Sequence, residues 1–366
     1  MVVRVALDVS AAPARLAGAG RYMAELVTHL TEVDLEVVTR RNDESRWIPV
    51  RGSVHGIVAS PRPVRLLEEA LWLGWSGPAR QSDLWHGPHY TMPLVTRRPV
   101  VVTVHDMTFF SHPEWHESAK VAFFRSAISR AARRAAAVVC VSEATASEFA
   151  DLAPRAPVVV APHGVDVVRF RPDADGDADI LSRAGLDREV PAIVFVGTLE
   201  PRKGVDTLVD AFANVSRAHP DAELWLAGQP GWGLDVDTLI ASSPARERIR
   251  RLGFVDDKLL APLLRRANVV AYPSRGEGFG LPVLEALACG SPVVTTRGTV
   301  MEEVAGGCAT LVQPGDAREL ADALSALLEA GRHDVHRAAR GVARAREFTW
   351  ERSARAHVTA YERALS

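Results

Sequence analysis

The chain has 366 residues, a formal net charge of −2 at pH 7, and a composition that is 47% hydrophobic and 24% charged. A single hydrophobic core rarely grows beyond about 250–300 residues, so this length predicts two domains, and the composition is typical of ordinary globular proteins. The near-neutral charge gives no electrostatic basis for binding nucleic acid.

The N-terminal segment, the lack of a long apolar run and the cysteines together indicate a cytoplasmic protein. Residues 1–10 predict a first strand. The segment is too short and too soon charged for a signal peptide. No segment approaches the ~20 apolar residues of a membrane-spanning helix. Cys140, Cys289 and Cys308 lie far apart in apolar runs, without metal-ligand spacing, and indicate buried free thiols in a reducing compartment.

Short β-branched apolar runs alternate with longer amphipathic segments along the chain, which is typical of stacked βαβ units. In the first half, strands are expected at 3–7, 35–39, 84–85, 100–104, 137–141 and 158–161. In the second half, they are expected at 192–196, 223–227, 249–252, 269–272, 292–295 and 310–312. The pattern predicts an α/β fold of two Rossmann-like, doubly wound domains facing each other across a cleft, with ligands at the carboxyl ends of the strands.

The polar, acidic segment 169–179 is the best candidate for a linker, and it divides the chain into domains at 1–165 and 166–349. Its alternating aspartates resemble a calcium-binding loop, but Gly176 is misplaced and no bidentate glutamate follows, so no calcium site is predicted. Residues 350–366 have helical periodicity, with Thr349 as a plausible N-cap.

Two segments of the first half end strands with residues suited to ligand contact. Gly18 and Gly20 lie in a loop after the first strand, and the third glycine of a dinucleotide-binding motif is missing at the right distance. His105 and Asp106 end the strand 100–104, where a histidine of a doubly wound fold points at the ligand edge. A structural role for His105 is the alternative.

The segment 194–204 is a strand, a turn at Gly197, and two adjacent cations that open a helix. Arg202 can fork onto two phosphate oxygens, and Lys203 adds a compact charge. Cations at a helix amino terminus oppose the helix dipole, so their placement predicts an anion beside them. The alternative is a solvated basic pair at the end of a loop.

The segment 274–286 is the most informative in the chain. It predicts a strand-to-helix turn in which glycines allow a close backbone approach and the helix amino terminus favours an anion. Glu277 lies in the turn and Glu285 in the helix, where carboxylates suit a ligand with many hydroxyl groups. A nucleotide-sugar combines hydroxyls with a diphosphate. The alternative is an ordinary loop with two solvated glutamates.

The two glutamates, seven residues apart with Phe279-Gly280-Leu281-Pro282 between them, closely resemble the donor-site motif of the retaining GT-B glycosyltransferases of family four (glycosyltransferase group 1). The resemblance covers nearly the whole chain and is strongest over 194–315. It implies a GT-B fold with an acceptor domain at 1–165, a donor domain at 166–349 and a final helix, 350–366, that crosses back onto the first domain.

The resemblance also implies roles for individual residues. Catalytic roles fall to Arg202 and Lys203 on the leaving diphosphate, and to His105 and Glu277 on the transferred sugar. Glu285 would hold the ribose. The other donor-binding positions that it implies are Gly18, Gly20, Gly197, Phe254, Val255, Gly278, Phe279, Gly280 and Leu281. No carboxylate is placed as a nucleophile, so the implied mechanism is displacement on the same face of the sugar within an ion pair.

No metal and no other cofactor is expected, because two cations already serve the phosphates and Asp235-Val-Asp237 opens a predicted helix rather than ending a strand. Residues 230–232 and 112–115 are similar to segments of GDP-mannose users, which favours GDP-mannose as the donor. The acceptor is expected to be a glycan, a lipid-linked sugar or a small molecule. Two rivals remain: a nucleotide-sugar 2-epimerase of related fold, and a non-catalytic carbohydrate-binding relative.

Basic residues lie beside aromatic ones in 62–75 and in 120–134. Such faces dock on anionic lipid, which would fit peripheral contact with the inner face of a membrane and a lipid-linked acceptor. Packed helices with one solvated face are the alternative.

Overall fold

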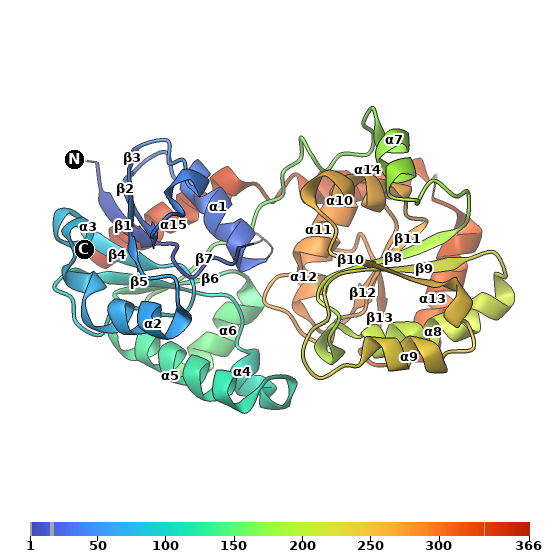
Figure 1. Ribbon diagram of the computed structural model, residues 1–366, viewed down its shortest axis with the longest axis horizontal. Helices are drawn as coiled ribbons and strands as arrows, with labels where there is room; N and C mark the ends of the chain where they lie inside the picture. The colour runs from blue at the N-terminus through green and yellow to red at the C-terminus, as the bar shows by residue number, and fades with distance from the viewer. Residues whose placement is uncertain (1, 15–17, 333) are drawn as a thin grey trace. The chain divides into compact units, whose positions relative to one another are not determined.

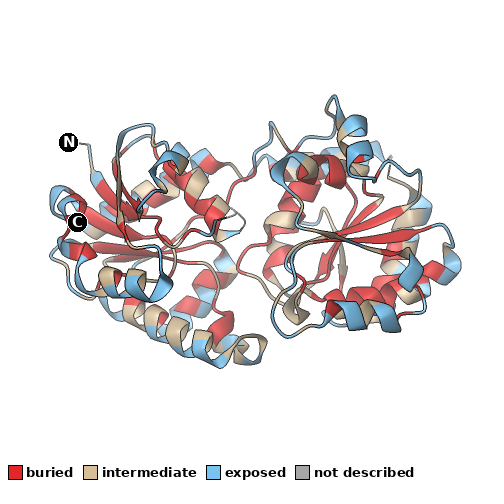
Figure 2. Cartoon of the chain, viewed as in Figure 1, coloured by how far each residue is buried: buried red, intermediate tan, exposed pale blue. Residues whose placement is uncertain are grey.

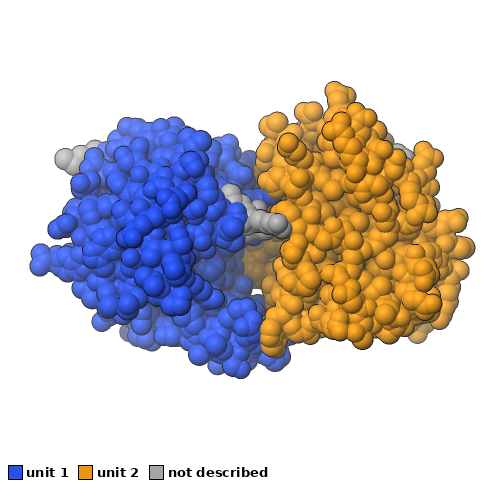
Figure 3. Space-filling model, in the orientation of Figure 1, with its two compact units in different colours: residues 1–164, 349–366 blue, residues 165–348 orange. Residues whose placement is uncertain are grey.

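The computed structural model describes residues 2–14, 18–332 and 334–366, and the chain divides into two compact units. Unit 1 consists of Met1–Gly164 and Thr349–Ser366, and unit 2 of Val165–Phe348; Figure 3 colours them blue and orange. Each unit is a parallel sheet between two layers of helices (Figure 1), so that the central strands are buried and the outer faces of the helices exposed (Figure 2). This is the predicted fold class.

Unit 1 contains a parallel sheet in the order β3-β2-β1-β4-β5-β6-β7. Its strands are β1 (Arg4–Asp8), β2 (Asp34–Arg40), β3 (Gly52–Val58), β4 (Leu84–Gly87), β5 (Val100–Val104), β6 (Ala137–Cys140) and β7 (Val158–Val160). Its helices are α1 (Ala19–His29), α2 (Arg62–Leu71), α3 (Gly77–Gln81), α4 (Thr108–Ser111), α5 (Ser118–Arg134), α6 (Glu143–Leu152) and α15 (Trp350–Leu365).

Unit 2 contains a parallel sheet in the order β10-β9-β8-β11-β12-β13. Its strands are β8 (Ala192–Val196), β9 (Glu223–Ala227), β10 (Ile249–Gly253), β11 (Val269–Tyr272), β12 (Val293–Thr296) and β13 (Thr310–Val312). Its helices are α7 (Asp177–Arg183), α8 (Val205–Ala218), α9 (Val236–Ser242), α10 (Asp257–Arg266), α11 (Leu281–Ala288), α12 (Val300–Ala305), α13 (Ala317–Ala330) and α14 (Val335–Ala345).

Every predicted strand is present within two residues of its expected bounds, whereas β3 was not predicted. Its sequence contains two glycines and a histidine, which weakens the β-branched signal on which the prediction depended. The strand forms because it pairs along its length with β2 at one edge of the sheet. A strand defined by its neighbour rather than by its own residues is hard to see in a sequence.

Both sheets reverse strand order at one point, and that point fixes where a ligand can bind. In unit 1 the reversal lies between β1 and β4, where Leu7 is level with His86; in unit 2 it lies between β8 and β11, where Val194 is level with Val270. In doubly wound folds, ligands bind outside the carboxyl ends of the strands at this switch point. The segments that follow β1, β4, β8 and β11 are therefore the first places to search for a site.

Helix α15 packs against α1 and the sheet of unit 1. A buried hydrogen-bond network helps to hold it there. The Tyr361 hydroxyl lies 2.8 Å from Nδ1 of His86, and Nε2 of His357 lies 2.7 Å from the Tyr22 hydroxyl. Thr103 joins the two pairs, because its hydroxyl contacts both Tyr22 and His86. Thr349 caps the helix by accepting a hydrogen bond from the Arg352 N–H at 3.1 Å, as predicted.

None of the helices in the described parts of the chain combines the length and the apolar character needed to cross a bilayer.

Replacing Tyr361 with Phe should destabilise unit 1 while preserving its packing. The substitution removes only a hydroxyl and leaves Nδ1 of buried His86 without that partner, which costs about 1–3 kcal/mol. Urea unfolding, with Thr359→Ala on the exposed face of the same helix as a control, measures the difference. Equal unfolding free energies for the two variants would contradict the role assigned to the network.

Candidate active site

Two loops meet at the switch point of unit 2. One follows β8 and ends in a single 3-10 turn, Pro201–Lys203, and the other joins β11 to α11. The Arg202 carbonyl accepts hydrogen bonds from the Arg275 N–H at 2.8 Å and the Ser274 hydroxyl at 3.1 Å. Gly204 has a φ of 70°, and a Cβ there would lie 2.2 Å from the Pro273 carbonyl oxygen. Only glycine therefore allows this close approach.

The Glu277 carboxylate lies at the centre of this junction. It accepts hydrogen bonds from Nη1 of Arg202 at 2.9 Å and from Nζ of Lys203. The hydroxyls of Tyr272 and Ser274 add bonds of 2.9 and 3.0 Å. Burial would raise the pKa of Glu277, but Arg202 and then Lys203 lower it to about 2. The carboxylate is thus ionised and, with its side chain 10% exposed, nearly enclosed.

The two cations have further partners around the same carboxylate. Arg202 donates to the Gly276 carbonyl at 2.7 Å and to Oε1 of Glu200 at 3.0 Å, and Lys203 donates to the Tyr272 hydroxyl at 2.9 Å. Burial lowers the pKa of Lys203, and Glu277 opposes that effect. The sequence predicted an anion beside these cations, and Glu277 is one. Their placement by itself therefore does not require a bound phosphate, which corrects that step of the sequence argument.

The predicted glycine turn leads into α11, and its residues are held closely. Gly280 is the N-cap of α11 with a φ of 98°, and Gly278 and Phe279 are buried beside it. Leu281 begins the helix, and Glu285 is buried one turn later. Both glutamates thus lie where the sequence predicted, one in the loop and one in the helix; their separate roles stay predictions.

The remaining donor-binding candidates of unit 2 lie along the same carboxyl edge. Gly197 directly follows β8, and its N–H donates to the Ala227 carbonyl at 2.9 Å. Phe254 and Val255 follow β10, and the Phe254 side chain is 40% exposed. An exposed aromatic ring at the ligand edge is a suitable surface for a base.

Asp235 is the N-cap of α9, where its carboxylate accepts a hydrogen bond from the Thr238 N–H at 3.2 Å, and Asp237 forms an ion pair with Arg251. This confirms that the Asp-x-Asp segment opens a helix. In the described ranges of the chain, no group of three or more histidine, cysteine, aspartate or glutamate side chains is placed to hold a metal ion.

In unit 1, His105 follows β5. Its Nε2 lies 2.8 Å from the Pro88 carbonyl, so Nε2 carries the proton and donates it. Burial lowers the pKa of His105, although the Pro88 bond and Asp106 oppose this. A neutral ring leaves Nδ1 as an acceptor, which suits a sugar hydroxyl. Asp106 instead accepts hydrogen bonds from the Thr108 N–H and hydroxyl and so fixes the end of the strand.

The glycines of the first loop are placed at the start of α1. Gly18 is the N-cap, with a φ of 50°, and a Cβ there would meet no atom within 4 Å. Gly20 is buried in the first turn. Residues 15–17 of this loop lie outside the described residues.

Sequence reasoning missed several polar residues at the two switch points. In unit 2 they are Tyr272 and Ser274, which flank Pro273 just before the glycine turn and hydrogen-bond to Glu277. In unit 1 they are Asp8, the last residue of β1, and Glu69 of α2. A charged residue ending an apolar strand was an available signal for Asp8, whereas no local pattern marks Glu69.

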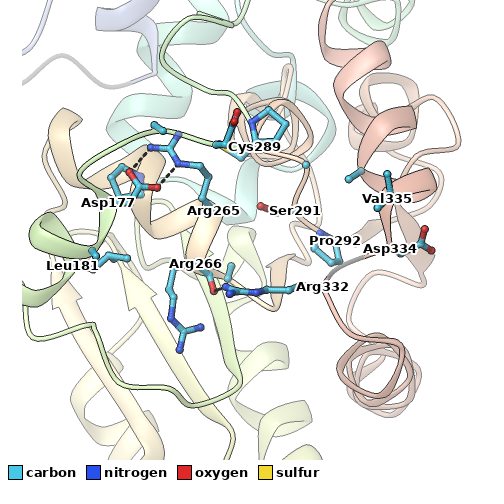
Figure 4. Close-up of a pocket in the computed structure, with 18 residues that line it drawn as sticks. Asp177, Leu181, Arg265, Arg266, Cys289, Ser291, Pro292, Arg332, Asp334 and Val335 are labelled. Carbon is cyan, nitrogen blue, oxygen red and sulfur yellow. Dashed lines mark hydrogen bonds and ion pairs between the residues drawn. The ribbon is translucent and has the colours of Figure 1, made fainter.

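A cavity of about 600 Å³ in unit 2 lies elsewhere (Figure 4). It opens at the amino ends of β11 and β12, beside Ala267 and Pro292, whereas the junction around Glu277 lies at the carboxyl ends. Arg265 and Asp177 line it and bind each other through two hydrogen bonds of 2.5 and 2.7 Å. Since this pair joins α7 to α10, we assign it a structural role.

Comparison with known proteins identifies the family of the chain. A family model described as "Glycosyl transferases group 1" matches residues 190–330, and one described as "Glycosyltransferase Family 4" matches residues 16–169. The O-antigen chain mannosyltransferase B of Escherichia coli is 29% identical over 95% of this chain and 96% of its own length. A D-inositol 3-phosphate glycosyltransferase of Kineococcus radiotolerans is 31% identical over 95% of this chain and 91% of its own length.

Among solved structures, HepE of Anabaena in complex with UDP and glucose has a similar fold, with a TM-score of 0.76 and 22% identity over 99% of this chain and 100% of that one. The fold and the family models together define a glycosyltransferase of the GT-B class. The chain belongs to glycosyltransferase family 4. The relatives are named as transferases and give no support to the epimerase alternative.

Replacing Glu277 with Gln should destabilise unit 2 in a pH-dependent way. Because the pKa of folded Glu277 lies below its ordinary 4.5, the ionised carboxylate stabilises the fold above about pH 4.5, and that contribution is lost as the pH falls toward 2. The variant should lose roughly 2–4 kcal/mol at pH 7 and much less at pH 3. Denaturant unfolding at both pH values measures this, with Glu189→Gln as an exposed control. A difference independent of pH would be the contrary result.

Proposed function

We propose that this glycosyltransferase is metal-independent and retains the configuration of the sugar that it transfers. The observation that supports this is the Glu277 carboxylate held between Arg202 and Lys203 at the switch point of unit 2. The cations would bind the donor diphosphate and neutralise the charge that builds up as it leaves, which is often the largest contribution to such catalysis. Lys203 is held by Tyr272 and Arg202 by Gly276, so little reorganisation is needed.

In the proposed reaction, the bond between the anomeric carbon and the diphosphate oxygen breaks, and its electron pair leaves with the diphosphate. An acceptor hydroxyl then forms the new glycosidic bond on the same face of the sugar and passes its proton to the departing phosphate oxygen. Glu277 and the backbone of 278–281 would hold the transferred sugar. Glu285 would hold the ribose, and neutral His105 would contribute an acceptor for a sugar hydroxyl.

The donor that we propose is GDP-mannose, and the acceptor a glycan or lipid-linked sugar. The mannosyltransferase name of the Escherichia coli relative supports the sugar, whereas the Anabaena structure, with UDP and glucose, makes UDP-glucose the main competitor. Glycan chains are the acceptors that the name of the first relative indicates.

We further propose that unit 1 makes peripheral contact with the cytoplasmic face of a membrane. Helix α2 and the turn after it expose large apolar side chains, namely Val64, Leu67, Leu71, Trp72 and Trp75. The Arg97 guanidinium lies 5.1 Å from the centre of the Trp75 ring. Aromatic and basic side chains together suit the interface of an anionic bilayer.

A panel of nucleotide-sugars tests the donor and the phosphate site together. Titration calorimetry should show that GDP-mannose binds the wild-type protein and binds more weakly when Arg202 and Lys203 are both changed to Ala. The double variant should also lose about 100-fold or more in kcat/KM, because charge-assisted hydrogen bonds contribute about 1.5–3 kcal/mol each. Arg217→Ala, on the far end of α8, is the matched control. Wild-type protein that binds no nucleotide-sugar would refute the proposal.

Chelation tests the absence of a metal requirement. Transfer should continue at its full rate after exhaustive treatment with EDTA, because the cationic side chains take the place of Mg²⁺ on the diphosphate. Loss of activity that Mg²⁺ or Mn²⁺ restores would show that the phosphate site has been misinterpreted.

A further inference from the structure

The switch point of unit 1 holds a buried pair of acidic side chains. Asp8 ends β1, one residue after the Leu7–His86 pair of β1 and β4, and its carboxylate accepts a hydrogen bond from the Ser10 N–H at 2.9 Å. Glu69 reaches the same place from α2 and is only 3% exposed. Two carboxyl groups buried side by side are costly to a fold unless something binds them.

Helix α2 departs from the usual pattern of a surface helix, in which apolar side chains are buried and charged ones exposed. It buries Glu69 and exposes Leu67 and Leu71. Arg65, one turn earlier, places Nη1 3.5 Å from Oε2 of Glu69, which gives an ion pair without a close hydrogen bond. Among the described residues, Oε2 of Glu69 has no hydrogen-bond partner. A buried carboxylate oxygen in this state normally marks a place for a missing donor.

A cavity adjoins Glu69. A cavity of about 220 Å³ lies between α2 and α5, and Glu69 and Thr91 form part of its wall. Ser126 and Arg130 of α5 add polar groups, and Phe123 adds an aromatic ring among otherwise apolar neighbours. A carboxyl and hydroxyls for hydrogen bonds, with an aromatic ring and apolar side chains for C–H groups, are the surfaces that a sugar ring needs.

We propose that this cavity binds a sugar ring of the acceptor, and that Glu69, with Asp8 and Arg65 behind it, accepts a hydrogen bond from one of its hydroxyl groups. The proposal rests on the proposed function, because it assigns the acceptor to unit 1 of a glycosyltransferase. It makes Glu69 and Thr91 residues that determine acceptor specificity.

The charges around the cavity select for a neutral ligand. Glu69 of α2 and Arg130 of α5 line the cavity, and Asp8 of β1 and Arg65 of α2 act on Glu69, so carboxyl and guanidinium groups balance and favour neither an anion nor a metal ion. Burial and then Asp8 raise the pKa of Glu69 to about 7, against the opposing effects of a hydrogen bond with the Thr91 side chain and of Arg65. Acceptor binding through an ionised Glu69 should therefore strengthen between about pH 6 and 8.

Glu69→Gln tests the proposal, with methyl glycosides of mannose, glucose, galactose and N-acetylglucosamine as probes. Saturation-transfer NMR should detect at least one probe on the wild-type protein. The variant should weaken that probe at least tenfold at pH 8 and abolish the pH dependence, whereas the control Glu32→Gln, exposed beyond α1, should change neither. No binding of any probe to the wild type, or equal binding to Glu69→Gln, would overturn the proposal.

The donor and the fold are measured on the same variants. Calorimetry with GDP-mannose should give the same affinity for wild type and Glu69→Gln, so failure of the donor to bind the wild type reports on the proposed function and not on this cavity. Raised carboxyl pKa values mean that stability falls as the pH rises from 4.5 to 7, so the variant should melt no lower than the wild type at pH 8. A fall of several degrees would instead make Glu69 a structural partner of Arg65.

A second variant avoids the carboxyl pair altogether. Ser126→Trp projects from the exposed side of α5 and should fill the cavity without removing any charge. It should lose the sugar probe and keep GDP-mannose affinity and melting temperature. Undiminished probe binding in this variant would place the sugar elsewhere.

Discussion

The junction in unit 2 depends on one shared carboxylate. Without Glu277, the guanidinium of Arg202 and the ammonium of Lys203 would be two like charges held close together in a largely buried place. With it, and with Glu200 beside Arg202, the two positive charges are balanced and the loops after β8 and β11 are joined. Because the anion is part of the chain, the cations are already arranged before any substrate arrives. A bound diphosphate would then share them with Glu277 rather than assemble them, which is preorganisation in the physical sense.

The sequence predicted the sheets well because strands buried on both faces are continuous apolar runs, and that signal is local. It failed for β3, whose residues are ordinary and whose partner β2 defines it. It also failed for the partner of the cations, since Arg202 and Glu277 are separated by 75 positions and only the fold makes them neighbours. The rule that cations at the start of a helix need an anion was correct. Whether that anion is a bound ligand or a side chain of the protein depends on residues far apart in the sequence, so the local pattern does not reveal it. Glu69 shows the same limit, since nothing in α2 reveals that Asp8 lies beside it.

The two units use the same topology with opposite electrostatic designs. At the switch point of unit 2, Arg202 and Lys203 share the Glu277 carboxylate, and Glu200 also pairs with Arg202, so a bound diphosphate would share cations that are already balanced. At the switch point of unit 1, two carboxyl groups share the nearby guanidinium of Arg65, and the surroundings disfavour an anion. A transferase that takes a charged donor and a neutral hydroxyl acceptor needs both designs. The charges of the two units are thus consistent with the proposed binding of the donor by unit 2 and the acceptor by unit 1.

With the proposed membrane contact, helix α2 would link the acceptor cavity to the bilayer. Its buried face presents Glu69 to a cavity of the size and polarity of a sugar site, while its outer face presents Leu67 and Leu71 to the solvent. Exposing leucines to water and burying a glutamate are each energetically unfavourable. Together they suggest that the two faces of α2 bind different partners, an apolar one outside and a polar one inside. A lipid-linked sugar supplies both, because its lipid lies in the bilayer while its sugar stands at the surface. On this proposal, the pattern of α2 fits an amphipathic substrate. Substitutions on the outer face of α2 should then affect membrane contact, and substitutions on its buried face should affect sugar selection.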